Sequence, residues 1–110
     1  MQKMKSSSQD SFVLAERYYS ILSAINGLKL TQREIQLVAF TAVKGSISFA
    51  NVRDEFCKKY DTTSPTINNM ISKLKKMAIL TKAGGKIKVN PIIQLNFAQD
   101  VTLQIRLTHE

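Results

Sequence analysis

Residues 64–91, SPTINNMISKLKKMAILTKAGGKIKVNP, contain the most informative patterns of the chain. Ser64-Pro65 is a strong helix start, because proline is tolerated where the first helical amide has no partner. Apolar residues then recur every three or four positions from Ile67 to Met77. This spacing predicts an amphipathic helix over residues 65–78, with short polar side chains and lysines on the face opposite the apolar stripe.

After Leu80 the helical period gives way to alternation of apolar and polar residues. The pair Gly84-Gly85 separates two such runs, and a glycine pair is a favoured two-residue hairpin turn because both residues accept positive φ. The hairpin predicted over residues 80–90 is basic, since it carries Lys82, Lys86 and Lys88. A helix followed at once by a basic hairpin is therefore expected.

Two further helices are predicted before this pair. Residues 31–34, TQRE, match a capping box, so a helix should begin there and run to about Lys44, with Gly45 ending it. Residues 46–48 are short enough for a small strand. Ser48 is the expected cap of the next helix, which carries an apolar stripe of spacing three and four as far as Tyr60.

The two ends of the chain add elements to this core. Apolar residues at helical spacing, ended by Asn26-Gly27, predict an extra N-terminal helix within residues 10–29. Residues 1–9 are expected to be a flexible basic tail, and residues 92–110 a C-terminal extension with one amphipathic strand, Val101–Thr108. The helix and strand offer surface for a homodimer. The alternative is that they cover the core of a monomer.

The charge of the chain favours a polyanionic partner. Its 16 Lys and Arg against 8 Asp and Glu give a formal net charge of +8. Residues 58–88 hold eight lysines against the single Asp61, so nearly the whole excess lies in this part of the chain. Basic residues clustered in this way are typical of a surface that meets nucleic acid.

Other classes of protein receive no support from the sequence. The lone Cys57 and the single His109 form no cluster with metal-ligand spacing, so no metal or cofactor is expected. Enzymatic activity is not expected, because the adjacent Asp54 and Glu55 diverge on a helix and no phosphate loop or nucleophile elbow occurs. No apolar run is long enough to span a bilayer and the start is polar, which predicts a cytoplasmic protein without a membrane partner.

These elements predict a mainly α fold with a small β-hairpin, in which three helices form a core and the hairpin a wing. In residues 30–91 the chain resembles winged helix-turn-helix proteins, through LTQREIQLVAF, SFANVRDEFCKKY and the stretch quoted above. It is similar to MarR-like regulators, and its end also resembles the winged helices of plasmid and phage replication proteins. The resemblance implies binding of double-stranded DNA in transcription regulation or replication control of a phage, plasmid or bacterium.

In that interpretation the helix over residues 65–78 enters the major groove and the wing flanks it. Asn69 can pair bidentately with adenine, Thr66 and Ser72 can contact bases or phosphate, and the lysines can contact phosphate. The candidate DNA contacts are Thr62, Thr63, Ser64, Thr66, Asn68, Asn69, Ser72, Lys73, Lys76, Lys82, Lys86 and Lys88. The alternative is a winged helix that binds another protein, or an assembly module of a phage or plasmid, without reading DNA.

Overall fold

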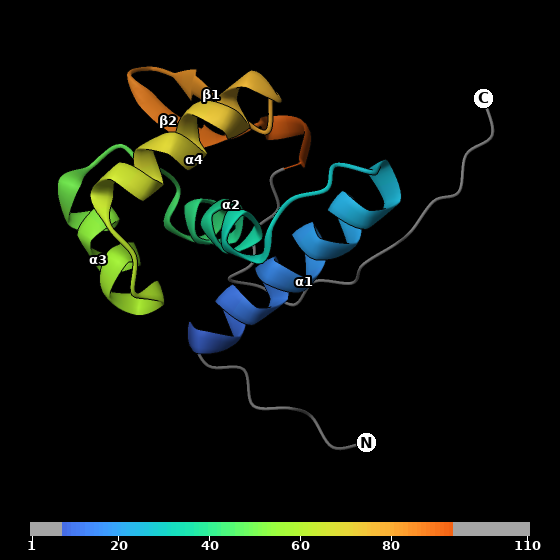
Figure 1. Ribbon diagram of the computed structural model, residues 1–110, viewed down its shortest axis with the longest axis horizontal. Helices are drawn as coiled ribbons and strands as arrows, with labels where there is room; N and C mark the ends of the chain where they lie inside the picture. Colours follow the sequence, from blue (N-terminus) through green and yellow to red (C-terminus); the bar gives the residue numbers. More distant parts are fainter. Residues whose placement is uncertain (1–7, 94–110) are drawn as a thin grey trace.

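The computed structural model describes residues 8–93. Within this range the chain forms four α-helices and a two-stranded antiparallel sheet (Figure 1). The helices are α1 (Ser8–Asn26), α2 (Gln32–Lys44), α3 (Ala50–Tyr60) and α4 (Ser64–Lys76). The strands β1 (Leu80–Ala83) and β2 (Lys86–Val89) follow, and the short 3-10 helix Pro91–Ile93 comes last. The predicted class, mainly α with a small hairpin, is confirmed.

The N-terminal helix begins earlier than predicted. Helix α1 begins at Ser8, so residues 8 and 9, expected in the tail, belong to the helix. Residues 1–7 of that tail and the predicted strand Val101–Thr108 lie outside the described residues.

Helix α2 lies at the centre of the molecule, between α1 and α4 (Figure 1). Its start is the predicted capping box: the Thr31 hydroxyl accepts from the Glu34 amide at 3.1 Å, and Glu34 Oε1 accepts from the Thr31 amide at 2.8 Å. Its end is the predicted glycine, since Gly45 adopts the left-handed conformation with φ 91°. Eight residues of α2 are buried, so both sides of this helix pack against other elements.

An aromatic cluster joins the first three helices. The ring of Phe40 on α2 stacks on Phe12 of α1 at a centroid distance of 5.5 Å and meets Phe56 of α3 edge-on at 5.3 Å. Tyr60 at the end of α3 packs against Phe56 at 4.7 Å. Such pairs add about 0.5 to 1.5 kcal/mol each beyond the area they bury.

Two tyrosine hydroxyls attach α1 to the rest of the fold. Tyr19 donates to the backbone carbonyl of Ile93 at 2.7 Å, and Tyr60 donates to Glu16 Oε2 at 3.1 Å. Burial raises the pKa of both tyrosines, with a further rise from the neighbouring Tyr18 for the first and from the Glu16 carboxylate for the second. Helix α1 is therefore a packed part of the domain.

The predicted turn of the hairpin is confirmed. Gly84 and Gly85 have φ values of 60° and 78°, as a two-residue turn with both central residues left-handed requires. The register places Leu80 opposite Val89, and both side chains are buried at the base of the hairpin. Helix α4 ends at Lys76, two residues before its predicted end, because Ala78 turns left-handed with φ 62° and leads the chain into β1.

The predictions for residues 46–48 are wrong. These residues form no strand, and Ser48 does not cap α3, whose N-cap is Phe49 without a side-chain hydrogen bond. The Ser48 hydroxyl instead accepts from the Ile87 amide at 2.6 Å, while the Ile47 amide donates to the Ile87 carbonyl at 3.0 Å. The reason is the open edge of β2, whose backbone groups are satisfied by this passing segment.

Candidate nucleic-acid interface

The outer face of α4 is set by its buried stripe. Ile67, Met70, Ile71 and Leu74 point into the core, which leaves Pro65, Asn69, Ser72 and Lys76 on the opposite side. All four are exposed. Within residues 8–93, the side chains of Asn69, Ser72 and Lys76 have no hydrogen bond or ion pair. Their polar groups are therefore available to a ligand.

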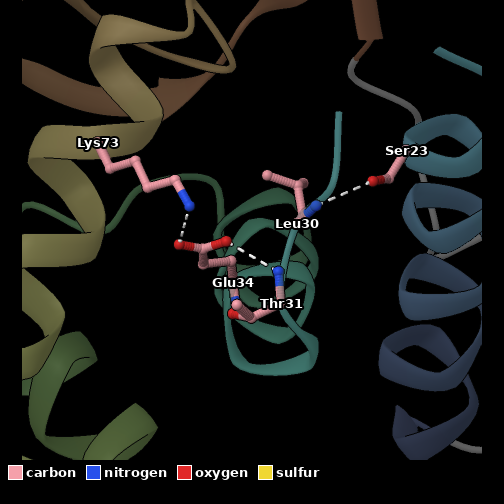
Figure 2. Close-up of polar contacts among 5 residues, drawn as sticks. All are labelled: Ser23, Leu30, Thr31, Glu34 and Lys73. Atoms are coloured by element: carbon pink, nitrogen blue, oxygen red, sulfur yellow. Dashed lines mark hydrogen bonds and ion pairs between the residues drawn. The ribbon is translucent and has the colours of Figure 1, made fainter. Parts of the chain in front are cut away.

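Lys73 lies on the flank of α4 that faces α2. Its ammonium is 2.8 Å from Glu34 Oε2, and the other oxygen of this carboxylate completes the capping box at Thr31. Figure 2 draws both contacts. The side chain of Glu34 is only 7% exposed, whereas that of Lys73 is 49% exposed. Burial of the carboxyl acts to raise its pKa, but the hydrogen bonds from Lys73 and Thr31 outweigh it and hold the pKa of Glu34 below its usual value. Lys73, predicted as a phosphate contact, already has a carboxylate partner.

Asn68 lies on the other flank of α4, towards the start of α3. Its Oδ1 accepts from Nη1 of Arg53 at 2.8 Å, and Nε of the same arginine donates to the Ile47 carbonyl at 2.8 Å. Arg53 was not among the predicted site residues. No local pattern could have revealed it, because its partner is 15 residues away along the chain.

The predicted hydroxyl residues gather around the first turn of α4. Thr63, Ser64 and Thr66 are exposed and Thr62 is half-buried. The hydroxyls of Thr63 and Thr66 lie 3.0 Å apart, and Thr63, the N-cap, makes no side-chain bond to a helix amide. The first turn of α4 thus combines hydroxyls with amides that no side chain caps.

The hairpin lysines are all exposed but do not share one face. Cross-strand partners lie on the same side of a sheet, so Lys88 shares a face with its partner Thr81 and with Lys86, two residues before it. Lys82, opposite Ile87, lies on the other face. The ammonium of Lys86 also stands 5.8 Å from the ring centroid of Phe49, which is 50% exposed. Phe49 is a second residue of this surface that the sequence interpretation did not include.

The segment that forms α4 and the hairpin is basic. From Ser64 to Val89 the chain carries six lysines and no acidic residue, and all six are exposed. The carboxylate that pairs with Lys73, Glu34, comes from α2. Lys75, the sixth, lies on the same side of α4 as Asn68, since residues seven apart return to one face. Among residues 8–93, no group of His, Cys, Asp and Glu could hold a metal ion. The helices of this part of the chain include none with the length and apolarity to cross a membrane.

Comparison of the chain with known protein families, with curated proteins and with solved structures finds no match.

Proposed function

We propose that the chain is a winged-helix protein that binds double-stranded DNA, with α4 in the major groove and the β1–β2 hairpin as the wing. The observation that carries this proposal is the segment from Ser64 to Val89, which has six exposed lysines, no acidic residue and an outer helix face of free polar groups. Clustered positive charge supplies the sequence-independent part of DNA binding, and short polar side chains supply the sequence-dependent part.

The arrangement of the elements supports α4 as the helix that enters the groove. Its buried stripe belongs to the same core as buried residues of α2 and α3, and its opposite side is exposed. Figure 1 shows α4 beside the hairpin. The major groove of B-DNA is about 12 Å wide and admits a helix. In this pose Asn69 reaches a base edge and Lys76 reaches a phosphate, while the first turn of α4 faces the backbone.

The hairpin would meet the DNA next to this groove. Its base is anchored by the buried Leu80 and Val89, and the Asn90 side chain donates to the Ala78 carbonyl at 2.9 Å, which ties the end of β2 to the end of α4. The hairpin is thus held at a defined place relative to α4. Its face with Lys86 and Lys88 offers two adjacent cations to one stretch of phosphates.

The resemblance to winged helix-turn-helix proteins supports a biological role in transcription regulation or replication control. The alternative role is binding of another protein by the same surface. The two roles differ in how strongly the affinity for duplex DNA should depend on salt. Binding of DNA releases counterions from the phosphates, so affinity must fall steeply as salt rises.

The test is fluorescence anisotropy of labelled duplex DNA between about 50 and 200 mM salt. We expect affinity to fall with a log–log slope of several units, because each lysine that contacts a phosphate contributes about −0.9. Lys76→Gln should weaken binding, whereas Arg17→Gln, a matched change at an exposed position of α1, should not. Duplex RNA of the same sequence should compete poorly, because its major groove is too narrow for the helix. Absence of salt-dependent DNA binding would overturn the proposal and favour the protein-binding role.

A further inference from the structure

We infer that the two adjacent asparagines of α4 read different bases: Asn68, positioned by Arg53, acts only as a hydrogen-bond donor and selects guanine, whereas Asn69 reads adenine. This inference rests on the proposed DNA-binding function and specifies its sequence preference. It depends on one contact, the 2.8 Å bond from Arg53 Nη1 to Asn68 Oδ1.

Arg53 is itself held in place at two points. Its Nε donates to the Ile47 carbonyl at 2.8 Å, just before α3, and its backbone amide donates to the Phe49 carbonyl in the first turn of that helix. The guanidinium is planar and its N–H groups form a rigid fork. Because Nε is fixed on the backbone, the direction in which Nη1 points is fixed as well.

A fixed guanidinium decides the orientation of the Asn68 amide. The guanidinium has donors and no acceptor, so only the carbonyl oxygen of the amide can face it. Rotation of the amide by half a turn would bring N–H groups against N–H groups. The two N–H groups of Asn68 Nδ2 are therefore what this exposed side chain offers to a ligand.

A group that offers donors discriminates among the bases of the major groove. Guanine presents two adjacent acceptors, O6 and N7, whereas adenine places its own amino donor beside N7. Thymine presents one acceptor, O4, beside a methyl group. Asn68 therefore matches guanine best. It cannot pair bidentately with adenine, because its acceptor, Oδ1, is bonded to Arg53.

Asn69 provides the contrast within the same helix. It is exposed, and its side chain has no partner within the described residues. Its amide can turn to present an acceptor and a donor together, the pair that adenine N6 and N7 require. Neighbours on a helix are separated by about 100°, so the two amides contact different base pairs.

The experiment is selection of binding sites from randomised DNA duplexes, followed by affinity measurement on the selected site and its single-base variants. Wild type should select a guanine and an adenine at separate positions. Asn68→Asp keeps an acceptor for Arg53 but replaces the free donors with an acceptor, so the guanine should change to cytosine, whose N4 is a donor. Asn69→Ala, the matched control, should lose only the adenine preference, by about tenfold or more.

Arg53→Lys tests the positioning role. A lysine keeps the charge but lacks the rigid fork, so the amide of Asn68 is no longer held. Preference at the guanine position should then relax about tenfold and admit adenine, while the position read by Asn69 stays unchanged. A purely structural role of Arg53 would instead weaken binding to all sequences alike.

The outcomes separate this inference from the function on which it rests. If wild type selects a motif and the Asn68 and Arg53 variants select the same one, the assignment of Asn68 is wrong and DNA binding stands. If wild type retains no duplex at all, the proposed function fails and the inference fails with it. Circular dichroism of each variant checks that the helices are intact.

Discussion

The ammonium of Lys73 on α4 lies 2.8 Å from the buried carboxylate of Glu34 on α2 (Figure 2). The same carboxylate accepts from the Thr31 amide at the start of α2. The Glu34 side chain thus completes the cap of α2 and also binds one flank of α4, the proposed recognition helix. Lys73 therefore differs from the other lysines of α4 because it has a structural partner.

Lys73→Ala should therefore lower the stability of the protein, whereas Lys76→Ala should lower its affinity for DNA. Loss of Lys73 leaves the Glu34 carboxylate without its cation, which should lower the free energy of unfolding by about 1 kcal/mol. Loss of Lys76 should leave stability unchanged but reduce DNA affinity and flatten the salt slope by about one unit. Urea denaturation and anisotropy titrations measure the two effects. Equal stabilities of the two variants would contradict the structural role of Lys73.

Acid should weaken the fold through Glu34. Its pKa is lower in the folded protein than the usual value of 4.5, so the folded state binds fewer protons than the unfolded state. The stabilisation that the ionised Glu34 side chain provides is therefore fully present above about pH 4.5 and is lost as the pH falls through the pKa of the folded state. Between about pH 5 and pH 3 wild type should lose more stability than Glu34→Gln. Lys73→Met should shrink the same loss, because it removes a cause of the lowered pKa. Thermal unfolding at several pH values checks this.

The hairpin should contribute to DNA affinity and little to folding. The triple variant Lys82→Gln, Lys86→Gln, Lys88→Gln should keep its thermal midpoint, because exposed lysines add little stability, and should bind DNA more weakly. Since Lys86 and Lys88 share one face, changing these two alone should give most of the loss if that face meets the phosphates. If the triple variant binds DNA as tightly as wild type, the hairpin lysines do not contribute to binding.

Ser48 should matter for holding the hairpin in place. Its hydroxyl accepts from the Ile87 amide at 2.6 Å, so Ser48→Ala leaves this amide without that partner. We expect a loss of about 1 to 2 kcal/mol in the free energy of unfolding and faster hydrogen exchange at Ile87. Ser72→Ala, on the exposed face of α4, serves as the matched control for stability. A stable Ser48→Ala variant with a protected Ile87 amide would show that the bond contributes little.

A dimer through the chain ends stays a prediction. Much of the apolar surface that motivated it is used within the monomer, since Ala15 and Tyr19 are buried and Phe12 stacks on Phe40. Helix α1 still leaves Val13 46% and Ile25 54% exposed. We expect sedimentation at micromolar concentration to give a dimer mass. Loss of the dimer on truncation after Asn96 would assign it to the C-terminal segment, and its loss in Ile25→Lys would assign it to α1. A monomer mass for the full chain would exclude it.

Much of the local structure could be predicted because it depends on neighbours in the chain. The capping box at residues 31–34 needs only two side chains and two amides within one turn, so its pattern is sufficient to place the start of α2. The turn at Gly84-Gly85 likewise follows from the freedom of glycine to adopt positive φ. The predicted end of α4 lies two residues beyond the observed one, because Ala78 takes a left-handed conformation that alanine seldom adopts.

The order of the helices and the hairpin, the buried stripe of α4 and the basic character of residues 64–89 could be predicted, since these rest on periodicity and composition. The partners of individual polar residues depend on how distant segments pack. Ser48 caps no helix but satisfies Ile87, 39 residues later, and Arg53 reaches Asn68, 15 residues later. Lys73 likewise turns from solvent to Glu34. The physical reason is that a polar group bonds to whatever donor or acceptor packing brings within about 3 Å, and packing between distant segments leaves no trace in local spacing.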